Sequence, residues 1–262
     1  KVPVPEAQKP VQSNQRIGMG EITTCRRLIV RSRPGFTLID VLVTMAVVAV
    51  LISLLAPSLT SVRETAHQVI CRSNVRQIGI GIYQYAEENG ERVPTATVVV
   101  GTPWDTVTLR LPGGSTDAWD GLGRLYAGGY LPAPQLYYCP SHRGNHRFQQ
   151  YSPQWGGQSG AIAGNYQYRA GGPMADYPAH NPNAPSTIFL SKIRGSAALL
   201  SDGLRSQSDF NHIIGANVLR ADLAVDWYRD QGGTLYEMLT KDDGTPTQSG
   251  MLAAWLRLDD PG

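Results

Sequence analysis

The sequence is poor in charge, and its small basic excess is confined to its first residues. Charged residues make up 17% of the 262 positions, whereas there are 28 glycines and 18 prolines. This composition favours a loop-rich body with modest regular structure. The formal net charge is +2, but residues 1–35 hold seven basic and two acidic residues, so the remainder carries 16 basic and 19 acidic residues, a net charge of −3. Because no basic stripe is present, nucleic-acid binding is not expected.

One long apolar run contrasts with this composition. Residues 36–56 contain a single charged residue, Asp40. As a helix rising 1.5 Å per residue, the run spans about 31 Å, enough to cross the hydrocarbon core of a bilayer. Because basic residues favour the cytoplasmic side, the start of the run should face the cytoplasm, and the rest of the chain should cross the membrane. The arginines that flank the start of the run are Arg26, Arg27, Arg31 and Arg33.

The Gly35-Phe36 junction and the tract Phe-Thr-Leu-Ile-Asp-Val-Leu-Val after it resemble the processing site of type IV prepilins and type II secretion pseudopilins. The resemblance implies that a prepilin peptidase cuts between Gly35 and Phe36, removes residues 1–35 as a basic leader, and N-methylates Phe36. A secretory signal peptide would have a shorter apolar core followed by a small-residue cleavage site. An uncleaved signal anchor is the second alternative.

Asp40 is the fifth residue counted from Phe36, where the resembled family usually has glutamate. A carboxylate inside a membrane segment is costly and is usually functional. Since buried charges are normally paired, we expect Asp40 to pair with the Phe36 amine of a neighbouring subunit and to set the axial register. A neutral Asp40, or a pair within one chain, are the alternatives.

The helical pattern continues beyond the apolar run, and we expect one helix from Phe36 to about Asn89. Residues 36–57 would form its membrane or filament-core half, and residues 58–90 an amphipathic half that packs on a head. Pro57 would weaken the helix locally, and in the resembled family a proline near this place marks where the helix can bend or melt. Apolar or small residues at steps of three and four define the expected stripe: Val62, Ala66, Val69, Ile70, Ser73, Gln77, Ile78, Ile82 and Tyr85.

The chain has three cysteines, Cys25, Cys71 and Cys139. Cys25 lies in the expected leader. The other two would enter an oxidising compartment, where a disulfide between them is permitted; the alternative is two separate buried residues. Neither has a Cys-x-x-Cys partner, so a zinc or thioredoxin-type site is not expected.

Residues 91–262 are expected to form a periplasmic head of short antiparallel strands and long loops, with strands in 186–190, 197–202 and 216–227. Several phrases resemble a family of pilin-like bacterial proteins that carry a His-x9-Asp-Gly motif. These phrases are Cys71-Arg-Ser-Asn74-Val-Arg-Gln77, Tyr138-Cys139-Pro140-Ser141, Asn217, and His212 with Asp222.

The glycine of that motif is replaced here by Leu223. Leucine resists positive φ, so we expect a longer hairpin turn or one of another type. His212 and Asp222 invite a catalytic interpretation, but no nucleophile accompanies them. We therefore expect His212 to cap or hydrogen-bond a hairpin, Asp222 to lie at its turn, and the protein not to be an enzyme.

Two further sets of residues could bind a metal ion. His142 and His146 lie four apart in a Gly/Asn-containing loop, so they do not form a helical metal-binding pair. Asp242 and Asp243 form an oxygen-rich turn, and major pseudopilins often hold calcium near the C-terminus. This turn lacks EF-hand spacing, so a solvated turn is the preferred interpretation and no cofactor is expected.

The sequence therefore predicts an α+β, pilin-like protein: a structural subunit of a type II secretion pseudopilus or type IV pilus-like fibre, which would serve protein transport in the first case. It would cross the inner membrane once. Its partners would be other subunits, the prepilin peptidase and the assembly machinery. The alternative is a membrane-anchored periplasmic binding module that does not polymerise and that uses exposed aromatic residues within 155–168 as its contact surface.

Overall fold

A computed structural model of the chain describes residues 35–96, 107–112, 118–157, 160–169, 189–212, 214–241 and 246–260. Two compact units are present, one ending at Leu51 and the other comprising Ile52–Gly262. The expected leader up to residue 34 and the calcium candidates Asp242 and Asp243 lie outside the described residues.

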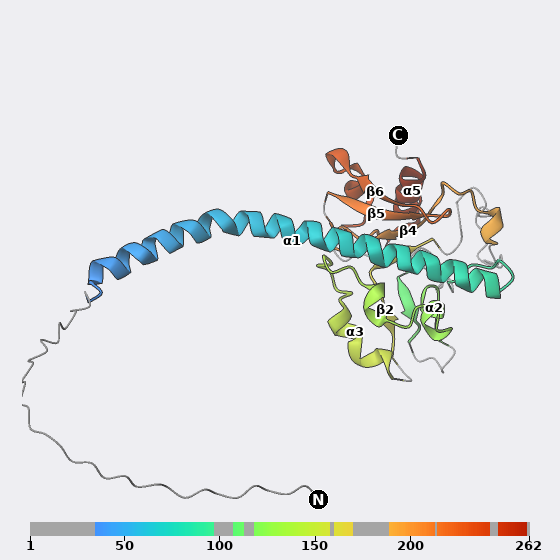
Figure 1. Cartoon of the computed structure of the whole chain (residues 1–262). Helices are drawn as coiled ribbons and strands as arrows, with labels where there is room; N and C mark the ends of the chain where they lie inside the picture. Colours follow the sequence, from blue (N-terminus) through green and yellow to red (C-terminus); the bar gives the residue numbers. More distant parts are fainter. Residues whose placement is uncertain are drawn as a thin grey trace, which may run out of the picture. The chain divides into compact units, whose positions relative to one another are not determined.

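Helix α1 (Leu38–Glu88) is 51 residues long and runs without interruption through Pro57 (Figure 1). Its ends lie within two residues of the predicted ones, which confirms the long N-terminal helix. The chain leaves the helix through Gly90 and Glu91, whose φ angles are +63° and +64°. Gly90 supplies the left-handed conformation that commonly ends a helix.

The main sheet has four antiparallel strands in the order β3 (Tyr166–Tyr168), β4 (Ala198–Asp202), β5 (Gly215–Arg220) and β6 (Val225–Arg229). The predicted strand at 197–202 is confirmed as β4, and the run 216–227 divides into the hairpin β5–β6. The prediction for 186–190 is wrong in its described part. Phe189 forms only an isolated bridge to Arg92, and the 3-10 helix η3 (Leu190–Lys192) follows it.

The other elements are short. A two-stranded antiparallel sheet joins β1 (Thr108–Arg110) to β2 (Ile162–Ala163). The remaining helices are α2 (Gly123–Ala127), η1 (Pro134–Tyr137), α3 (Phe148–Trp155), η4 (Gln231–Gly233), α4 (Thr234–Met238) and α5 (Gln248–Asp259). The protein is thus α+β, with one long apolar helix and small antiparallel sheets.

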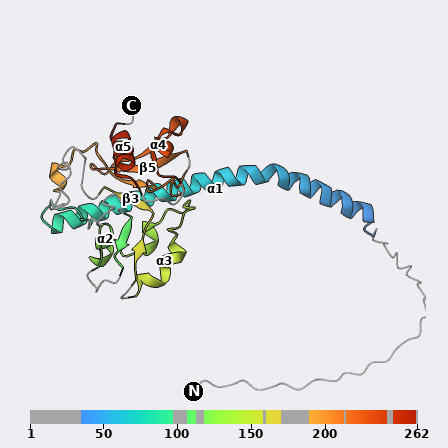
Figure 2. The same ribbon diagram turned by 180° about the vertical axis from the view of Figure 1, so that it is seen from behind.

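The main sheet separates two hydrophobic cores. Side chains on one strand alternate between its two faces, so Val218 of β5 packs in the core with α4 and α5, whereas Leu219 packs in the core with α1. Figures 1 and 2 show strands of this sheet between the second half of α1 and α5. Because both faces are covered, all six residues of β5 are buried.

The buried face of α1 differs from the predicted stripe. Val62, Val69 and Ile70 are 66%, 64% and 48% exposed, whereas Cys71 and Val75 are fully buried, as are Ile78 and Ile82. The prediction is therefore wrong for residues 62–77 and correct at Ile78 and Ile82. Two constraints that apolar periodicity does not record set the rotation of the helix: polar contacts from its second half to the head, and close packing at Gly79.

The close packing at Gly79 involves the β5–β6 hairpin. A Cβ atom on Gly79 would lie 2.7 Å from a methyl carbon of Leu219 and 3.1 Å from one of Leu223. Helix and hairpin can therefore approach closely only because residue 79 has no side chain. Gly79 is thus the position at which the helix and the hairpin meet most tightly among the helical glycines described.

The β5–β6 turn is longer than a two-residue hairpin, as expected, but Leu223 adopts the positive φ that leucine was expected to resist. The amide of Leu223 donates to the carbonyl of Arg220 (3.0 Å) and the amide of Arg220 donates to that of Ala224 (2.8 Å), so residues 221–223 form a loop closed by the Arg220–Ala224 pair. Leu223 has φ +68°, a conformation that usually requires glycine. Its side chain packs against the core that contains α1, which compensates for the strain.

Candidate functional site

The start of α1 brings the predicted processing and assembly residues together. Gly35 and Phe36 precede the helix, and the Phe36 side chain is 86% exposed. The amide and the hydroxyl of Thr37 donate to Oδ2 of Asp40 (3.0 and 2.7 Å), and the amide of Asp40 donates to the Thr37 hydroxyl (3.2 Å). This reciprocal arrangement is a capping box, which satisfies amides that the first helical turn leaves unpaired.

The first half of α1 exposes its apolar side chains. The most apolar part of the helix has a mean hydropathy of 2.8, and none of that stretch is buried. Leu38, Met45 and Leu54 are 80%, 69% and 68% exposed. Helix α1 is therefore long and apolar enough to cross a membrane.

A second group of polar residues lies buried in the Ile52–Gly262 unit, and we call it the Cys–His cluster. It consists of Cys71 from α1, Cys139 from the segment after η1, Asp202 from the end of β4, and His212 from the segment before β5. All four residues are buried, and one ligand atom from each lies within 4.8 Å of the others. The fold thus gathers two sulfurs, one imidazole nitrogen and one carboxylate oxygen.

His212 is the centre of this cluster. Its Nε2 lies 3.2 Å from Oδ2 of Asp202 and 3.4 Å from Sγ of Cys139, and its Nδ1 lies 2.7 Å from Oε1 of Glu64 on α1. Burial disfavours the charged imidazole, but the hydrogen bonds to Asp202 and Cys139 outweigh burial and raise the pKa of His212 to about 11.

The two thiols differ in acidity. Burial, the hydrogen bond with Cys139 and the Asp202 charge raise the pKa of the Cys71 thiol well above its usual value. Burial also opposes ionisation of Cys139, but hydrogen bonds with Cys71 and His212 outweigh it and lower the pKa of that thiol. Cys139 is therefore the sulfur better suited to carry negative charge.

Side chains around the cluster hold its members in place. Asn217 donates its amide to Oδ1 and its side-chain Nδ2 to Oδ2 of Asp202, both at 2.7 Å. The Ser141 hydroxyl donates to both oxygens of Glu64, at 3.1 and 2.9 Å. Tyr166 lies beside Cys71, with its hydroxyl 3.3 Å from Sγ.

The motif residues predicted from the sequence divide into two groups. Asn74 is buried and donates to the Tyr138 carbonyl (3.3 Å) and the Tyr166 hydroxyl (3.4 Å), so it borders the cluster as Asn217 does, whereas His212 belongs to the cluster. Gln77 is exposed, and its described hydrogen bonds reach only Ser73 on the same helix. Asp222 lies at the hairpin turn, where its carboxylate accepts from the Ala224 amide.

Two expectations about the cluster need correction. His212 does not cap a hairpin, because both of its ring nitrogens face buried or partly buried side chains of the cluster and of α1. Cys71 and Cys139 are free thiols in the structure, so the disulfide that the sequence permits is not formed. They are not separate core residues either, because their sulfur atoms lie within 4.8 Å of one another.

His142 and His146 converge on Asp209, an arrangement that sequence spacing did not predict. Nε2 of His142 and Nδ1 of His146 lie 3.5 and 3.6 Å from Oδ1 of Asp209. Nδ1 of His142 donates to Asn211 (2.6 Å), while its Nε2 accepts from the His146 amide (3.2 Å). Burial is the main cause that lowers the pKa of His142, so this imidazole is neutral at pH 7. These three residues form a second, partly exposed set of metal-ligating side chains.

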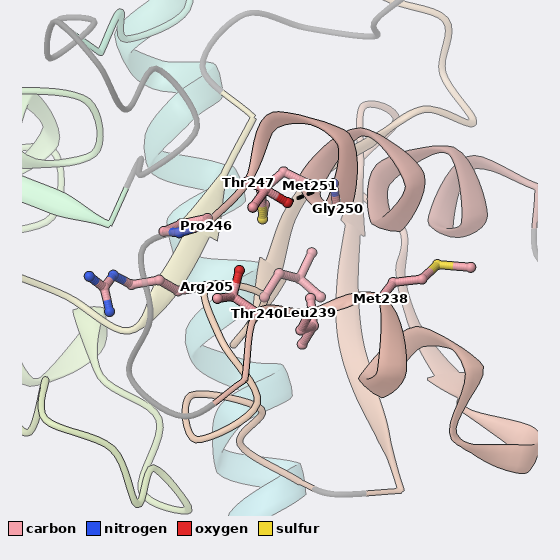
Figure 3. Close-up of a pocket in the computed structure, with 9 residues that line it drawn as sticks. Arg205, Met238, Leu239, Thr240, Pro246, Thr247, Gly250 and Met251 are labelled. Atoms are coloured by element: carbon pink, nitrogen blue, oxygen red, sulfur yellow. Dashed lines mark hydrogen bonds between the residues drawn. The ribbon is translucent and has the colours of Figure 1, made fainter.

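Two hollows accompany these side chains. The larger, of about 620 Å³, is lined by residues that include Asn74, Cys139 and His142, and so it opens beside the Cys–His cluster. The smaller, with about 130 Å³ of empty volume against about 1170 Å³ for the larger, lies between the end of α4 and the start of α5 (Figure 3). Arg205 lines the smaller hollow, but its guanidinium lies 3.5 Å from Asp209, and no member of the Cys–His cluster lines it.

The aromatic surface expected within 155–168 is not present. Trp155, Tyr166 and Tyr168 are only 5%, 2% and 1% exposed. Trp155 stacks on Tyr137 with ring centroids 5.2 Å apart, and its Nε1 donates to the Tyr138 hydroxyl. Burial of large rings in the core outweighs any advantage of displaying them, so the argument for a contact surface here fails.

Sequence reasoning missed four functional candidates: Glu64, Tyr166, Asp202 and Asp209. Asp202 had one signal that could have been used, since it is an acidic residue at the end of an apolar strand and its burial demands partners.

No family model, curated protein or solved structure matches this chain.

Proposed function

We propose that this protein is a structural subunit of a pilin-class fibre, either a type II secretion pseudopilus or a type IV pilus-like filament. In this proposal a prepilin peptidase cuts after Gly35 and N-methylates Phe36. The start of α1 faces the cytoplasm, and the head lies in the periplasm until assembly. The membrane, other subunits and the assembly machinery are the partners.

The exposed apolar surface of α1 is the observation that carries the proposal. Large apolar side chains are exposed along the helix from Leu38 to Leu59, far more than an isolated soluble protein tolerates. A bilayer can cover such a surface before assembly, and neighbouring helices can cover it in a fibre. A helix that only anchored the head would need the bilayer alone to cover this surface.

The exposed stripe in the second half of α1 favours a fibre over a simple anchor. Leu59, Val62, Val69 and Ile70 remain 48–66% exposed, and they continue the apolar surface beyond the length that a bilayer needs. Because the buried residues of α1 begin only at Cys71, the stripe is available for helices of neighbouring subunits.

The geometry at Asp40 is compatible with pairing between subunits. Both described hydrogen bonds to its carboxylate fall on Oδ2 and come from Thr37. In the proposal, the same carboxylate also meets the positively charged Phe36 amine of the next subunit, which neutralises both charges inside the fibre.

The test is the intact mass and N-terminal sequence of the full chain, expressed with a prepilin peptidase and recovered from membranes. A chain that begins at N-methylated Phe36 supports the proposal. Helix-to-helix crosslinks between copies, for example through cysteine introduced at Val69, then test assembly. A retained leader despite an active peptidase, or a monomer at all expression levels, would point to the anchored binding module instead.

Gly35→Leu is the matched control. Nothing lies within 4 Å of a Cβ atom placed on Gly35, so the substitution should leave the folded chain unchanged and affect only the peptidase. We expect it to abolish cleavage and assembly while the head keeps its thermal stability.

A further inference from the structure

We propose that Cys71, Cys139, Asp202 and His212 bind one zinc ion in a tetrahedral structural site that fastens helix α1 to the head. This inference does not depend on the fibre proposal, because all four residues lie in the Ile52–Gly262 unit. Sequence spacing argued against zinc, since neither cysteine has a nearby second cysteine. The fold supplies the missing ligands from distant positions.

The distances suit zinc. Metal–ligand bonds of about 2.0–2.3 Å place tetrahedral ligand atoms about 3.3–3.8 Å apart. Nε2 of His212 lies 3.2 Å from Oδ2 of Asp202 and 3.4 Å from Sγ of Cys139, and all four ligand atoms lie within 4.8 Å of one another. Only small side-chain movements are needed to surround an ion.

The ligand types select the metal. Two sulfurs and one imidazole favour zinc over magnesium or calcium, which prefer oxygen ligands. With four protein ligands, all of them buried, the site would leave no coordination position for a substrate, which is the arrangement of structural zinc rather than catalytic zinc.

The surrounding residues provide the outer contacts that metal ligands need. Glu64 accepts a hydrogen bond from Nδ1 of His212, which turns Nε2 toward the other ligands. Asn217 holds both oxygens of Asp202. A carboxylate behind a ligating histidine is a recurrent feature of zinc sites, because it orients the ring and raises its basicity.

Charge and access are also consistent with a cation. Asp202 is fully buried and Glu64 is half-buried, so the two carboxylates require nearby positive charge, which protonated His212 supplies without a metal and which the ion would supply in its place. Zinc would displace the protons of His212 and the thiols as it binds. Cys139 lines the hollow of about 620 Å³, which offers an entry route.

A disulfide between Cys71 and Cys139 is the competing arrangement. It would use the two sulfurs but would leave His212 and Asp202 as a separate ion pair. A shared ion would use the sulfur, the nitrogen and the carboxylate oxygen together, whereas a bridge would use the sulfurs alone.

The experiment uses the full chain in detergent with Cys25→Ser, so that every thiol counted is Cys71 or Cys139. We expect about one zinc ion per chain by elemental analysis, and two thiols after denaturation in chelator. Replacement by cobalt should give the intense visible bands of a tetrahedral ion and thiolate-to-cobalt charge transfer. An oxidised pair without zinc, another metal in place of zinc, or cobalt bands without charge transfer would each overturn the proposal.

Variants locate the ion. Cys139→Ser should reduce bound zinc to less than about a tenth of that in the parent, whereas His146→Ala, which alters the set around Asp209, should leave zinc and the cobalt spectrum unchanged. Loss of zinc in His146→Ala but not in Cys139→Ser would place the metal elsewhere. Because Cys139→Ser could fail to fold, the cobalt spectrum of the parent is the independent readout.

Glu64 tests the outer contact. Glu64→Gln should weaken zinc affinity about 10–100-fold in competition with a chromophoric chelator, while Glu87→Gln, at an exposed position on the same helix, should have no effect. Equal affinities in the two variants would remove Glu64 from the site.

Discussion

At the residue scale, Asp40 could act as a helix cap, as a charge partner, or as both. Its Oδ2 accepts from the amide and the hydroxyl of Thr37, which an asparagine oxygen could also do. Only a carboxylate can neutralise the amine of a neighbouring Phe36. A substitution that keeps the capping oxygen but removes the charge therefore separates helix capping from charge pairing.

We predict that Asp40→Glu keeps fibre assembly and that Asp40→Asn lowers the assembled fraction at least about tenfold, because removal of one partner of a buried ion pair costs about 3–5 kcal/mol. The measurement is the ratio of sheared fibre to membrane-bound subunit. Asp40→Ala, which loses both properties, is the reference. If Asp40→Asn assembles like the parent while Asp40→Ala does not, capping alone explains the residue.

Leu223 carries strain at the hairpin turn, with φ +68°. A left-handed conformation costs a non-glycine residue about 1–2 kcal/mol. We predict that Leu223→Gly is more stable than Leu223→Ala by about 1 kcal/mol, the reverse of the usual order, because both variants lose the same packing and only glycine removes the strain. Denaturant unfolding of the two variants measures the difference, and an alanine variant as stable as the glycine variant would contradict it.

At the element scale, the junction of α1 with the β5–β6 hairpin depends on Gly79. A Cβ atom there would lie 2.7 Å from a methyl carbon of Leu219, a fully buried side chain. At Gly81 the nearest atom, a methyl carbon of Leu125, is 3.4 Å from the corresponding Cβ. The same substitution at these two helical positions should therefore have opposite effects.

We predict that Gly79→Ala destabilises the head by about 1–3 kcal/mol through overpacking, less any gain in helix propensity. Gly81→Ala should be neutral or stabilising by up to about 1 kcal/mol, since alanine favours helix over glycine. Thermal unfolding of both variants, compared with the parent, is the measurement. Equal effects at the two positions would mean that the hairpin does not approach the helix as closely as described.

At the scale of the whole molecule, the head should fold without the apolar half of α1. Among the described residues, Cys71 is the first buried one, and Glu64 is the earliest residue of α1 whose described contacts reach the head. We predict that a chain beginning at Ser61 is a soluble monomer that unfolds cooperatively, whereas a chain beginning at Ser73 loses Glu64 and Cys71 and unfolds at a markedly lower temperature.

Size-exclusion chromatography and calorimetry of both truncated chains check this prediction. Loss of a large buried contact usually costs about 2–5 kcal/mol, which is a substantial part of the stability of one domain. If both chains melt alike, α1 contributes to the head only from Ser73 onward, and the contacts of Glu64 and Cys71 add little to stability.

Composition and local periodicity were sufficient to predict the long helix, its membrane-length apolar half and the strands β4 and β5–β6. These features depend on residues that are close in the sequence, since the spacing of apolar residues over a short segment is what favours a helix or a strand. The same local information placed the end of α1 within two residues of its observed position.

The tertiary structure alone decided which face of α1 is buried and which side chains meet in the Cys–His cluster. Cys71 and His212 are 141 positions apart, and only packing of the helix against the sheet brings them together. Apolar periodicity gave the wrong rotation over residues 62–77 because a glycine and a carboxylate, Gly79 and Glu64, orient the helix. Their contacts involve distant residues, and no local pattern in the sequence records such contacts.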